Sequence, residues 1–441
     1  MKNKIFKFSL LYICVMIFLL SLAVSFIYGV KIGYLREKPM FDKVYILYNF
    51  TLDFKKNISK IFNKNKIQSV NTKKNYKDLL ITSLNDISIS YTGKIPKDII
   101  VAATASLWID DDTLNHYLLF LYEEKIIHYV LLDEIKEFET VENLHKWPHG
   151  LIISDDHKIY YNFDSGNSLV KKNICGDRIW DIKGKFHHLM SINNSNNYLW
   201  TLRKNYFGAS NYAESFVKIN SDNGKILDSF NVNDLIIANS PNDYFSIKQR
   251  DLSSVWEYEP FHFNDIDILN KKFSIYFNEF SEGDLMISSR SLNMVFIIDP
   301  KNLKVKDLFF GKFRRQHDPD WNKGYITIYD NQTEWGENIR YNNSRIVKID
   351  YNNNKKISTI KLDNEFISDA RGNHDTLDLK DDDQLQLITS PYEGSLLLFK
   401  NNKKIFSMIN KQKGEILSIS NGKILSNNNF KEKLNSCKIK N

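Results

Sequence analysis

From about residue 85 onward, the chain is a succession of short runs in which apolar and polar residues alternate. Such runs include "GLIISDDHKIYYNFDSG" (150–166), "DLMISSRSLNMVFIID" (284–299) and "LQLITSPYEGSLLLFK" (385–400). Asn-Gly and Glu-Gly turns interrupt them, as in "SDNGK" (221–225) and "YEGS" (392–395). Alternation with a period of two, broken by tight turns, is typical of antiparallel strands and hairpins. Long helical periodicity is missing here, so the sequence predicts an all-β fold.

The strand pairs recur at a loose but regular spacing. One unit contains a histidine, a turn, a strand, a second turn and a second strand that often ends in Asp. Units begin at His262, at His317 55 positions later, and at His374 a further 57 positions on. The roughly 350 residues of this region then hold about six units, which predicts a six-bladed β-propeller. A large β-sandwich is the alternative, but it does not explain the spacing.

Residues 8–29, "FSLLYICVMIFLLSLAVSFIYG", form an uncharged apolar segment of 22 residues. That length is enough to cross a bilayer as a helix. Basic residues flank it on both sides, so the positive-inside rule does not set its orientation. A cleaved signal peptide is the alternative, although the run is longer than a usual signal h-region. We predict a transmembrane signal anchor over 1–30, a juxtamembrane stalk over 31–84 and a β-propeller over 85–441, with the propeller exported from an inner membrane into the periplasm.

The net charge of +7 is unevenly distributed along the chain. Residues 1–80 hold 15 Lys/Arg and 4 Asp/Glu, whereas the remainder holds 45 and 49. The basic N-terminal region fits either contact with lipid headgroups or a solvated linker. The propeller region offers no basic stripe of the kind that nucleic-acid binding requires, so we predict no nucleic-acid partner.

The chain has three cysteines, of which Cys14 lies in the apolar segment. Cys175 and Cys437 are able to pair, but their spacing supports neither a metal site nor a redox motif.

Several of the ten histidines occupy matching positions in the units: His149, His187, His188, His262, His317 and His374. In a propeller the innermost strand of each blade lines the central channel, so side chains at its leading end converge. Taken singly, a histidine before a strand is most often a turn residue bonded to backbone. Taken together, the set is compatible with a zinc or copper site, with nucleophilic or acid–base catalysis, or with a structural repeat signature.

Five segments carry a resemblance to a known family: "FHHLMSINNSNNYLWTL" (186–202), "FHFNDIDIL" (261–269), "DLMISSRSLNMVFIID" (284–299), "QHDPDWNKGYITIYDN" (316–331) and "NNSRIVKIDY" (342–351). In this order they resemble the bacterial arylsulfate sulfotransferase, or arylsulfotransferase, family. The resemblance covers about residues 145 to 400. It leaves the N-terminal region of the chain unaccounted for.

The resemblance implies an exported six-bladed propeller that moves a sulfuryl group from an aryl sulfate ester to a phenolic acceptor. It implies no nucleotide donor and no cofactor, and a covalent sulfohistidine intermediate. His317 matches the region of the family's nucleophile, and His188 and His262 match its supporting histidines. Arg290 matches its channel arginine and Asn264 a polar contact beside the histidines.

His187 and His374 complete the predicted substrate-binding residues. Successive side chains of a strand point to opposite faces, so only one of His187 and His188 is able to face the channel. His374 is equally compatible with a structural place in a turn. The family's calcium contacts and structural disulfide do not map onto this sequence, so we predict no metal site.

The chemistry of sulfuryl transfer is consistent with these assignments. The transferred group is SO₃-like, with negative charge on three oxygens, and needs in-line positioning and cationic donors, as phosphoryl transfer does. Arg290 offers a permanently charged fork, neutral His317 is a nitrogen nucleophile, and Asp318 is one candidate to fix its tautomer. An aryl ring could pack on Trp180, Phe261 and Trp321, although aromatic residues at such positions are more often core residues.

Three functions remain open at this stage. The first is a membrane-anchored sulfotransferase that uses the residues above. The second is a non-catalytic, membrane-anchored propeller that binds a ligand or a protein. The third is a metal- or quinone-dependent oxidoreductase, which the lack of a dedicated metal spacing disfavours. The joint presence of a nucleophile and a charge clamp favours the first, because a binding module needs neither.

Overall fold

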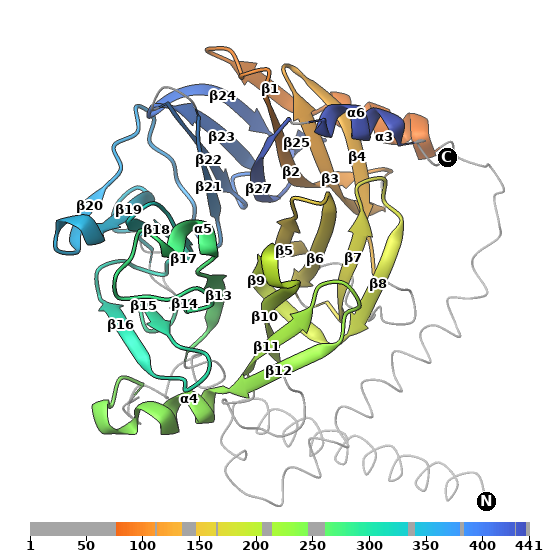
Figure 1. Cartoon of the computed structure of the whole chain (residues 1–441). Coiled ribbons are helices and arrows are strands. Elements are labelled where there is room, and N and C mark those ends of the chain that lie inside the picture. The colour runs from red at the N-terminus through yellow and green to blue at the C-terminus, as the bar shows by residue number, and fades with distance from the viewer. Residues whose placement is uncertain are drawn as a thin grey trace, which may run out of the picture. The chain divides into compact units, whose positions relative to one another are not determined.

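The computed structural model describes residues 76–437 with the exception of 111–112, 135–146, 165, 205–213, 246–260, 334–339, 380–382 and 428. Most of their strands form six antiparallel sheets arranged around one axis, five with four strands and one with five (Figure 1). The predicted all-β, six-bladed propeller is therefore confirmed.

The blades follow the chain order, from the innermost strand outward. Blade 1 contains β27 (Ile419–Ser426), β2 (Ile99–Trp108), β3 (Leu114–Tyr122) and β4 (Lys125–Leu132). Blade 2 contains β5 (Trp147–Ile153), β6 (Lys158–Asp164), β7 (Ser168–Asn173) and β8 (Arg178–Lys183). Blade 3 contains β9 (Lys185–Asn193), β10 (Tyr198–Lys204), β11 (Glu214–Asn220) and β12 (Ile226–Asn231).

Blade 4 contains β13 (Phe263–Ile268), β14 (Leu285–Ser289), β15 (Met294–Ile298) and β16 (Val305–Phe310). Blade 5 contains β17 (His317–Trp321), β18 (Tyr325–Asp330), β19 (Arg345–Asp350) and β20 (Lys356–Thr359). Blade 6 contains β21 (Asn373–Asp378), β22 (Gln384–Ser390), β23 (Ser395–Lys400) and β24 (Lys403–Ile409), with β1 (Ser88–Tyr91) added at its outer edge.

Strands from both ends of the described chain close the ring. β27, the last strand in sequence, is the innermost strand of blade 1 and pairs with β2 from Ile99↔Ser426 to Ala105↔Ile419. β1, the first strand, pairs with β24 of blade 6. Closure turns the inner edges of the sheets toward the channel, where they are protected from edge-to-edge association.

The hydrophobic core lies between neighbouring blades. In one cluster Met286 of β14 and Ile297 of β15 pack together with Ile326 of β18 and Val347 of β19, and all four are buried. These strands read as near-continuous apolar runs because each blade is covered on both faces by its neighbours.

Short helices decorate the blades: α3 (Tyr76–Asn85), α4 (Val232–Asn239), α5 (Lys271–Ser274) and α6 (Phe430–Ser436). A small hairpin, β25 (Lys411–Gln412) with β26 (Glu415–Ile416), precedes β27. Leu80 of α3 is buried in the cluster that also holds Val101 of β2 and Met408 of β24, so this helix belongs to the propeller.

Within the described part of the chain, no helix has the length and apolarity needed to span a membrane. The predicted anchor at residues 8–29 lies outside the described residues, as does most of the stalk predicted over 31–84.

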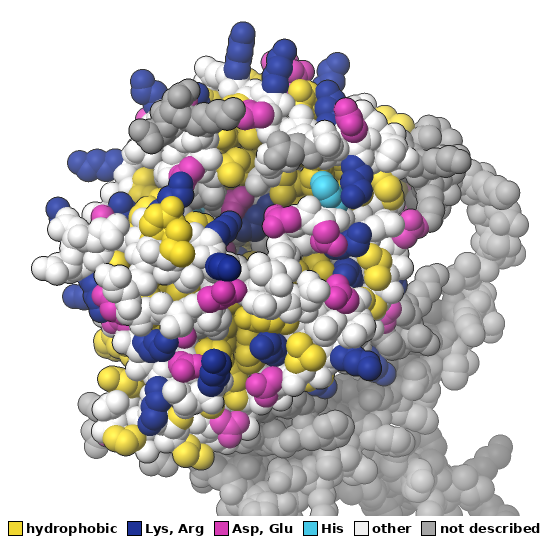
Figure 2. All heavy atoms as spheres, viewed as in Figure 1, with side chains coloured by type: hydrophobic (Ala, Val, Ile, Leu, Met, Phe, Trp, Pro, Cys, Tyr) yellow, Lys and Arg dark blue, Asp and Glu magenta, His cyan; other side chains and the backbone are white. Residues whose placement is uncertain are grey.

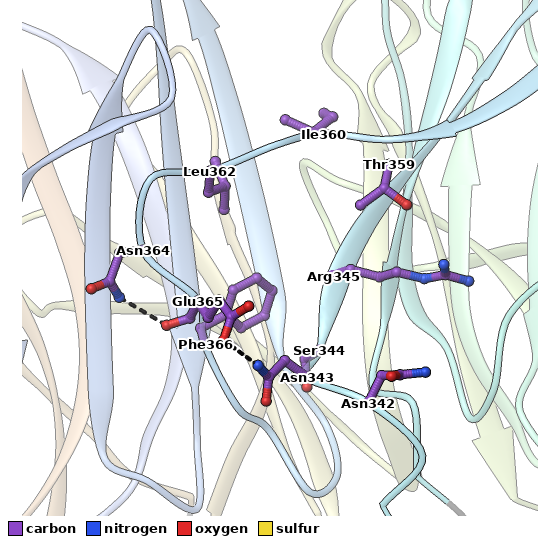
Figure 3. A pocket seen from close by; sticks show the side chains of 10 residues that line it. All are labelled: Asn342, Asn343, Ser344, Arg345, Thr359, Ile360, Leu362, Asn364, Glu365 and Phe366. Carbon is purple, nitrogen blue, oxygen red and sulfur yellow. Dashed lines mark hydrogen bonds between the residues drawn. The ribbon is translucent and has the colours of Figure 1, made fainter.

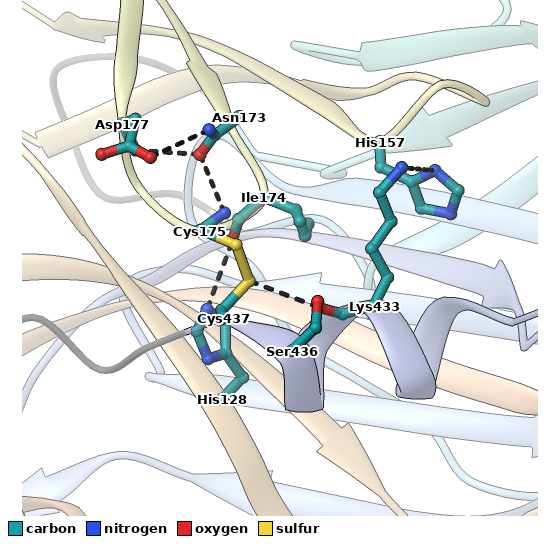
Figure 4. The surroundings of a disulfide bond; sticks show 9 residues. All are labelled: His128, His157, Asn173, Ile174, Cys175, Asp177, Lys433, Ser436 and Cys437. Carbon is teal, nitrogen blue, oxygen red and sulfur yellow. Dashed lines mark hydrogen bonds between the residues drawn. A yellow bond between two sulfur atoms is a disulfide. The ribbon is translucent and has the colours of Figure 1, made fainter.

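Cys175 and Cys437 form a disulfide whose Cα atoms are 5.1 Å apart (Figure 4). It joins the turn between β7 and β8 to the end of α6, the helix that follows the closing strand β27. Phe430 of α6 also packs against Phe120 of β3, with ring centroids 5.8 Å apart. The bond therefore ties the segment that closes the ring to blade 2.

Loss of this disulfide should destabilise the propeller. The bond spans 262 residues, and closing so long a loop in the unfolded chain is worth about 2–5 kcal/mol. We expect Cys175→Ser, Cys437→Ser and the double variant to lower the midpoint of thermal unfolding by the same amount. We also expect dithiothreitol to lower the midpoint of thermal unfolding of the wild type but not that of the three variants. Equal midpoints for wild type with and without reductant would contradict this role.

Candidate active site

The predicted histidines lie at one end of the central channel. In an antiparallel blade the innermost strand begins at the same end as the second strand finishes, so both contribute side chains there. We call this end the mouth. His149 of β5, His188 of β9, His262 just before β13 and His317 of β17 all stand near the start of an inner strand. Four consecutive blades, 2 to 5, thus each supply one histidine to the mouth.

Figures 1 and 2 show the face that carries α5 and α6, which follow the ends of the inner strands β13 and β27. This face is therefore the end of the channel opposite the mouth.

A β-bulge interrupts five of the six inner strands close to the mouth. The pairing register shifts in β5 between Pro148 and Leu151, and in β17 between His317 and Asp320. Comparable shifts affect β9, β13 and β27. A bulge adds an unpaired residue and redirects the side chains around it. Left-handed backbone at His188 (φ 60°) is part of this redirection.

Side-chain amides join the bulged strands of neighbouring blades. Each of five asparagines makes a hydrogen bond to the backbone of the next blade or of the segment leading into it. The bonds are Asn421 Nδ2 to His149 O at 2.8 Å, Asn162 Nδ2 to His188 O at 3.0 Å, Asn264 Nδ2 to Gln316 O at 2.7 Å, Asn331 Nδ2 to Arg371 O at 2.8 Å, and Gly422 N to Asn373 Oδ1 at 2.9 Å. We call this set the amide ring.

The ring of His188 contacts histidine rings of both neighbouring blades. The ring centroids of His149 and His188 are 4.2 Å apart, and those of His188 and His262 are 4.9 Å apart. His149 and His188 are buried. Gly150 allows this approach, because a Cβ there would lie 2.4 Å from the carbonyl oxygen of His188. The contact places nitrogen donors and acceptors of three blades side by side.

The protonation pattern of His317 follows from its hydrogen bond to Asn331. Asn331 donates through Nδ2 to the carbonyl oxygens of Ser368 and Arg371, which fixes the orientation of its amide. Its Oδ1 therefore faces His317 Nδ1 at 2.7 Å and accepts a hydrogen bond from the Nδ1–H group. The proton on Nδ1 leaves the lone pair on Nε2, which is buried and has no hydrogen-bond partner among the described residues.

His317 lines a small hollow at the mouth. Its other lining residues are His149, Leu189, Arg371, Gly372, Ser420 and Asn421. Five of these seven residues have polar side chains, and the hollow joins the nucleophile candidate of blade 5 to residues of blades 1, 2, 3 and 6.

Burial and nearby cations keep these histidines neutral. Burial lowers the pKa of His317 well below its usual value, and the positive charges of Arg290 and Arg315 lower it further. Burial and Arg371 likewise lower the pKa of His149. An imidazole that is neutral at pH 7 keeps the lone pair that a nucleophile or a general base needs.

The predicted arginine lies beside a predicted histidine. The backbone N–H of Arg290, just beyond β14, donates to His262 O at 3.1 Å. The Arg290 side chain is buried. Its charge lowers the pKa values of both His317 and His149. Arg290 thus contributes a fixed positive charge among the histidines.

The remaining predicted residues take different positions. Asn264 is fully buried as a member of the amide ring. His187 contacts the His188 ring at 4.9 Å and also lies 3.3 Å from the Glu214 carboxylate through Nε2. His374 bonds to Asp318 through Nδ1 and to Thr327 through Nε2, each at 2.8 Å. Asp318 therefore bonds to His374, whereas Asn331 fixes the tautomer of His317.

Asp318, Asp320 and His374 form a group whose possible ligand atoms all lie within 4.8 Å of one another. The charge of Lys423 acts on both carboxylates and the pKa of Lys423 is raised, with Asp375 the largest electrostatic cause. His374 already uses both ring nitrogens in hydrogen bonds. The side chains of this group thus already interact with one another or with Lys423.

The aromatic residues considered for an aryl-binding wall lie elsewhere. Trp321 is 2% exposed, with its ring 5.1 Å from that of Phe277 in the core between blades 4 and 5. Phe261 stacks on Phe263 inside the protein. Trp180 belongs to β8, the outermost strand of blade 2. The alternative interpretation as core or peripheral residues is the one that the structure supports.

A second hollow, of about 300 Å³, lies among segments of blade 5 and the connection to blade 6 (Figure 3). Its lining residues run from Asn342 to Arg345 and from Thr359 to Phe366. Arg345 is engaged with Asp330 at 2.8 Å, and neither a histidine nor a cysteine lines this hollow. The mouth therefore remains the stronger candidate for chemistry.

Sequence reasoning missed Asn331, Arg315 and Arg371 as parts of the site. Asn331 follows a strand at the end of the "YITIYDN" run, and a strand-terminal Asp-Asn reads first as a turn. Arg371 stands two positions before β21, at the mouth end of that inner strand. This place ahead of an inner strand is the one sequence signal that points to it.

The described fold has distant structural relatives. They include a protein of unknown function from Bacteroides caccae (TM-score 0.44, 10% identity, covering 74% of this chain and 99% of that one). They also include the Pan2 WD40 domain of Neurospora crassa (TM-score 0.39, 10% identity, covering 69% of this chain and 83% of that one). A third is virginiamycin B lyase of Staphylococcus aureus (TM-score 0.31, 12% identity, covering 57% of this chain and 69% of that one).

No curated protein sequence matches the chain. In contrast, the family model described as Arylsulfotransferase (ASST) matches residues 152–412, which is more than half of the chain and includes His188, His262, Arg290 and His317. The chain belongs to the arylsulfotransferase family.

Proposed function

We propose that this protein is a nucleotide-independent arylsulfate sulfotransferase that moves a sulfuryl group from an aryl sulfate ester to a phenol through a sulfohistidine at His317. The observation that carries the proposal is the state of His317, which lines the hollow, bonds through Nδ1 to Asn331 Oδ1, and has a buried Nε2 without a hydrogen-bond partner among the described residues. Membership of the family supports the reaction class.

In the first half-reaction, the His317 Nε2 lone pair forms a bond to sulfur while the bond from sulfur to the aryl oxygen breaks. The aryl group leaves as a phenolate. Arg290 stabilises the negative charge on the three sulfuryl oxygens, because a fixed cation in a buried site acts without reorganisation.

In the second half-reaction, the oxygen of the acceptor phenol attacks the same sulfur, and the bond from sulfur to Nε2 breaks. The acceptor must lose its proton as the new ester forms. His188 or His262, in ring contact with each other at 4.9 Å, accepts that proton as a neutral imidazole and later returns it to solvent. Nε2 regains its lone pair, and the site returns to its starting state.

We further propose that the propeller acts outside the cytoplasm, anchored through residues 8–29. The disulfide between Cys175 and Cys437 supports this, because structural disulfides persist mainly in oxidising compartments. A non-catalytic binding propeller is the competing function. It predicts no sulfate transfer by the wild type on any aryl sulfate.

Replacing His317 by alanine should abolish transfer. With purified full-length protein, p-nitrophenyl sulfate and a phenol acceptor, we expect kcat to fall at least about 10³-fold, because the nucleophile is removed. Wild type should show ping-pong kinetics and, with donor alone, an intact-mass increase of one SO₃ group on His317.

The matched control is His157→Ala. His157 lies in the turn between β5 and β6, at the opposite end of blade 2 from His149, so its activity should equal that of the wild type. Unchanged turnover in His317→Ala would remove His317 from the mechanism.

The activity should persist to acidic pH. Protonation of His317 abolishes its lone pair, so kcat/KM falls as the pH drops through the pKa of this group. Since burial and Arg290 lower that pKa, the acid limb of the profile should lie below pH 6.5, the usual histidine value. In Arg290→Gln one depressing charge is lost, so the limb should move to higher pH while the maximal rate falls about 10²-fold. An acid limb that stays in place in Arg290→Gln would exclude this coupling.

A further inference from the structure

Three side chains at the mouth form a group that the mechanism above does not use: Trp147, Arg371 and Tyr392. Trp147 begins β5, two positions before His149, and Arg371 stands two positions before β21. Tyr392 lies in the turn that follows β22. Starts of inner strands and ends of second strands meet at the mouth, so all three lie at the same end as the histidines.

The three side chains pack as an aromatic pair around a cation. The Arg371 guanidinium carbon lies 4.5 Å from the centroid of the Trp147 ring and 5.8 Å from that of Tyr392. The two aromatic rings meet edge to face with centroids 6.1 Å apart. Asp164, at the end of β6, pairs with one terminal nitrogen of Arg371. The two aromatic rings and the guanidinium are thus held in one arrangement before any ligand binds.

Arg371 connects this aromatic pair to His317. It lines the hollow with His317 and His149, and its charge lowers the pKa of His149. Its carbonyl oxygen accepts from Asn331 Nδ2 at 2.8 Å, and the same amide holds the proton of His317. The Asn331 side chain therefore fixes both the tautomer of His317 and the backbone position of Arg371.

The backbone around Arg371 has little freedom to move. Arg371 adopts a left-handed conformation at φ 64°, and Gly372 follows at φ 106°. A Cβ at Gly372 would lie 2.4 Å from the ring of Tyr329, a fully buried residue whose hydroxyl donates to Thr389 O at 2.8 Å. Left-handed backbone at a non-glycine residue persists where the surroundings over-determine it, and such positions cluster at functional sites.

The outer side of the group is open to solvent. Tyr392 is 49% exposed, and Trp147 is partly exposed. By contrast, Trp321 and Phe261 are buried in the core. Partly exposed aromatic surface of Trp147 and Tyr392 thus lies beside Arg371, which in turn lines the hollow with His317.

We infer that Trp147 and Tyr392 form the aryl-binding subsite of this enzyme and that Arg371 is a substrate-positioning residue for the sulfate group. An aryl sulfate is an aromatic ring joined through one oxygen to a singly charged anion. Its ring packs on the exposed aromatic pair, and its oxygens reach the guanidinium, whose planar fork has donors beyond the one that binds Asp164. The inference rests on the proposed function, since it names how that site selects its substrate.

Binding without turnover tests the subsite independently of catalysis. In full-length His317→Ala protein, we expect 2-naphthalenesulfonate to bind, as measured by titration calorimetry. Adding Trp147→Ala or Tyr392→Ala should weaken its Kd about 5- to 10-fold, because each removes an aromatic contact. Trp147→Phe, which keeps an aromatic face, should stay within about threefold of the parent. Because Tyr392 is half-exposed, its alanine variant is expected to fold as the wild type does.

A matched control comes from the same blade. Trp180 of β8 lies on the outermost strand of blade 2, so Trp180→Ala should leave the Kd unchanged. Arg371→Gln should weaken 2-naphthalenesulfonate about tenfold but leave neutral 2-naphthol unaffected, because only the anion uses the guanidinium. Equal Kd values for the parent, Trp147→Ala and Tyr392→Ala would overturn the subsite, and equal sulfonate binding by Arg371→Gln would overturn the role of Arg371.

Kinetics separate the subsite from the reaction itself. With His317 intact, Trp147→Ala should raise KM for p-nitrophenyl sulfate more than it lowers kcat, and it should reduce the preference for aryl over hexyl sulfate. If the wild type transfers no sulfate but binds 2-naphthalenesulfonate in a Trp147-dependent manner, the proposed reaction fails and the subsite stands. If transfer proceeds and neither KM nor the preference changes in Trp147→Ala, the subsite fails and the reaction stands.

Discussion

Hydrogen bonds from side-chain amides to the inner strands are the interaction on which the rest of the site depends. A bulged strand exposes backbone groups that have lost their ladder partners, and such groups are costly when buried. The amide ring supplies those partners across the junctions between blades. Asn162, for example, accepts from Gly150 N at 2.9 Å and donates to His188 O at 3.0 Å, so one amide joins two bulges. His149 and His188 are thereby held by their neighbouring blades, and Asn421 and Asn373 make corresponding bonds on both sides of the closing strand β27.

This arrangement explains which parts of the site the sequence could predict. The propeller follows from strand alternation and from the spacing of the histidines, both of which are local in sequence. His188, His262, Arg290 and His317 were predicted through the family's motifs, and the structure brings the histidines to the mouth. Strand parity alone does not decide between His187 and His188, because the period of two is broken by the bulge in β9. The bulge itself has no sequence signal that we could read.

The partners of these residues were harder to predict because they are remote in sequence. Asp318 is adjacent to His317 and was the natural candidate to fix its tautomer, but Asn331 does so from the end of the next strand. Aromatic residues were misjudged for a related reason. Trp321 is the last residue of an inner strand and was considered for a substrate wall, yet it fills the space between blades. Whether a ring faces a neighbouring blade or the mouth depends on its height along the channel, which is a property of the assembled ring of blades.

The concentration of cations around neutral histidines also has a consequence for the proposed reaction. In the unliganded site, burial and the charges of Arg290, Arg315 and Arg371 act in the same direction and depress the histidine pKa values. A bound sulfate ester brings a negative charge into this environment and offsets part of the cationic field, so the pKa values rise when the substrate is present. His317 is thus kept unprotonated until the donor arrives. In the proposed reaction the same anion raises the pKa of His188, which burial and the neighbouring histidines depress in the unliganded site, so His188 is a better proton acceptor when the site is occupied.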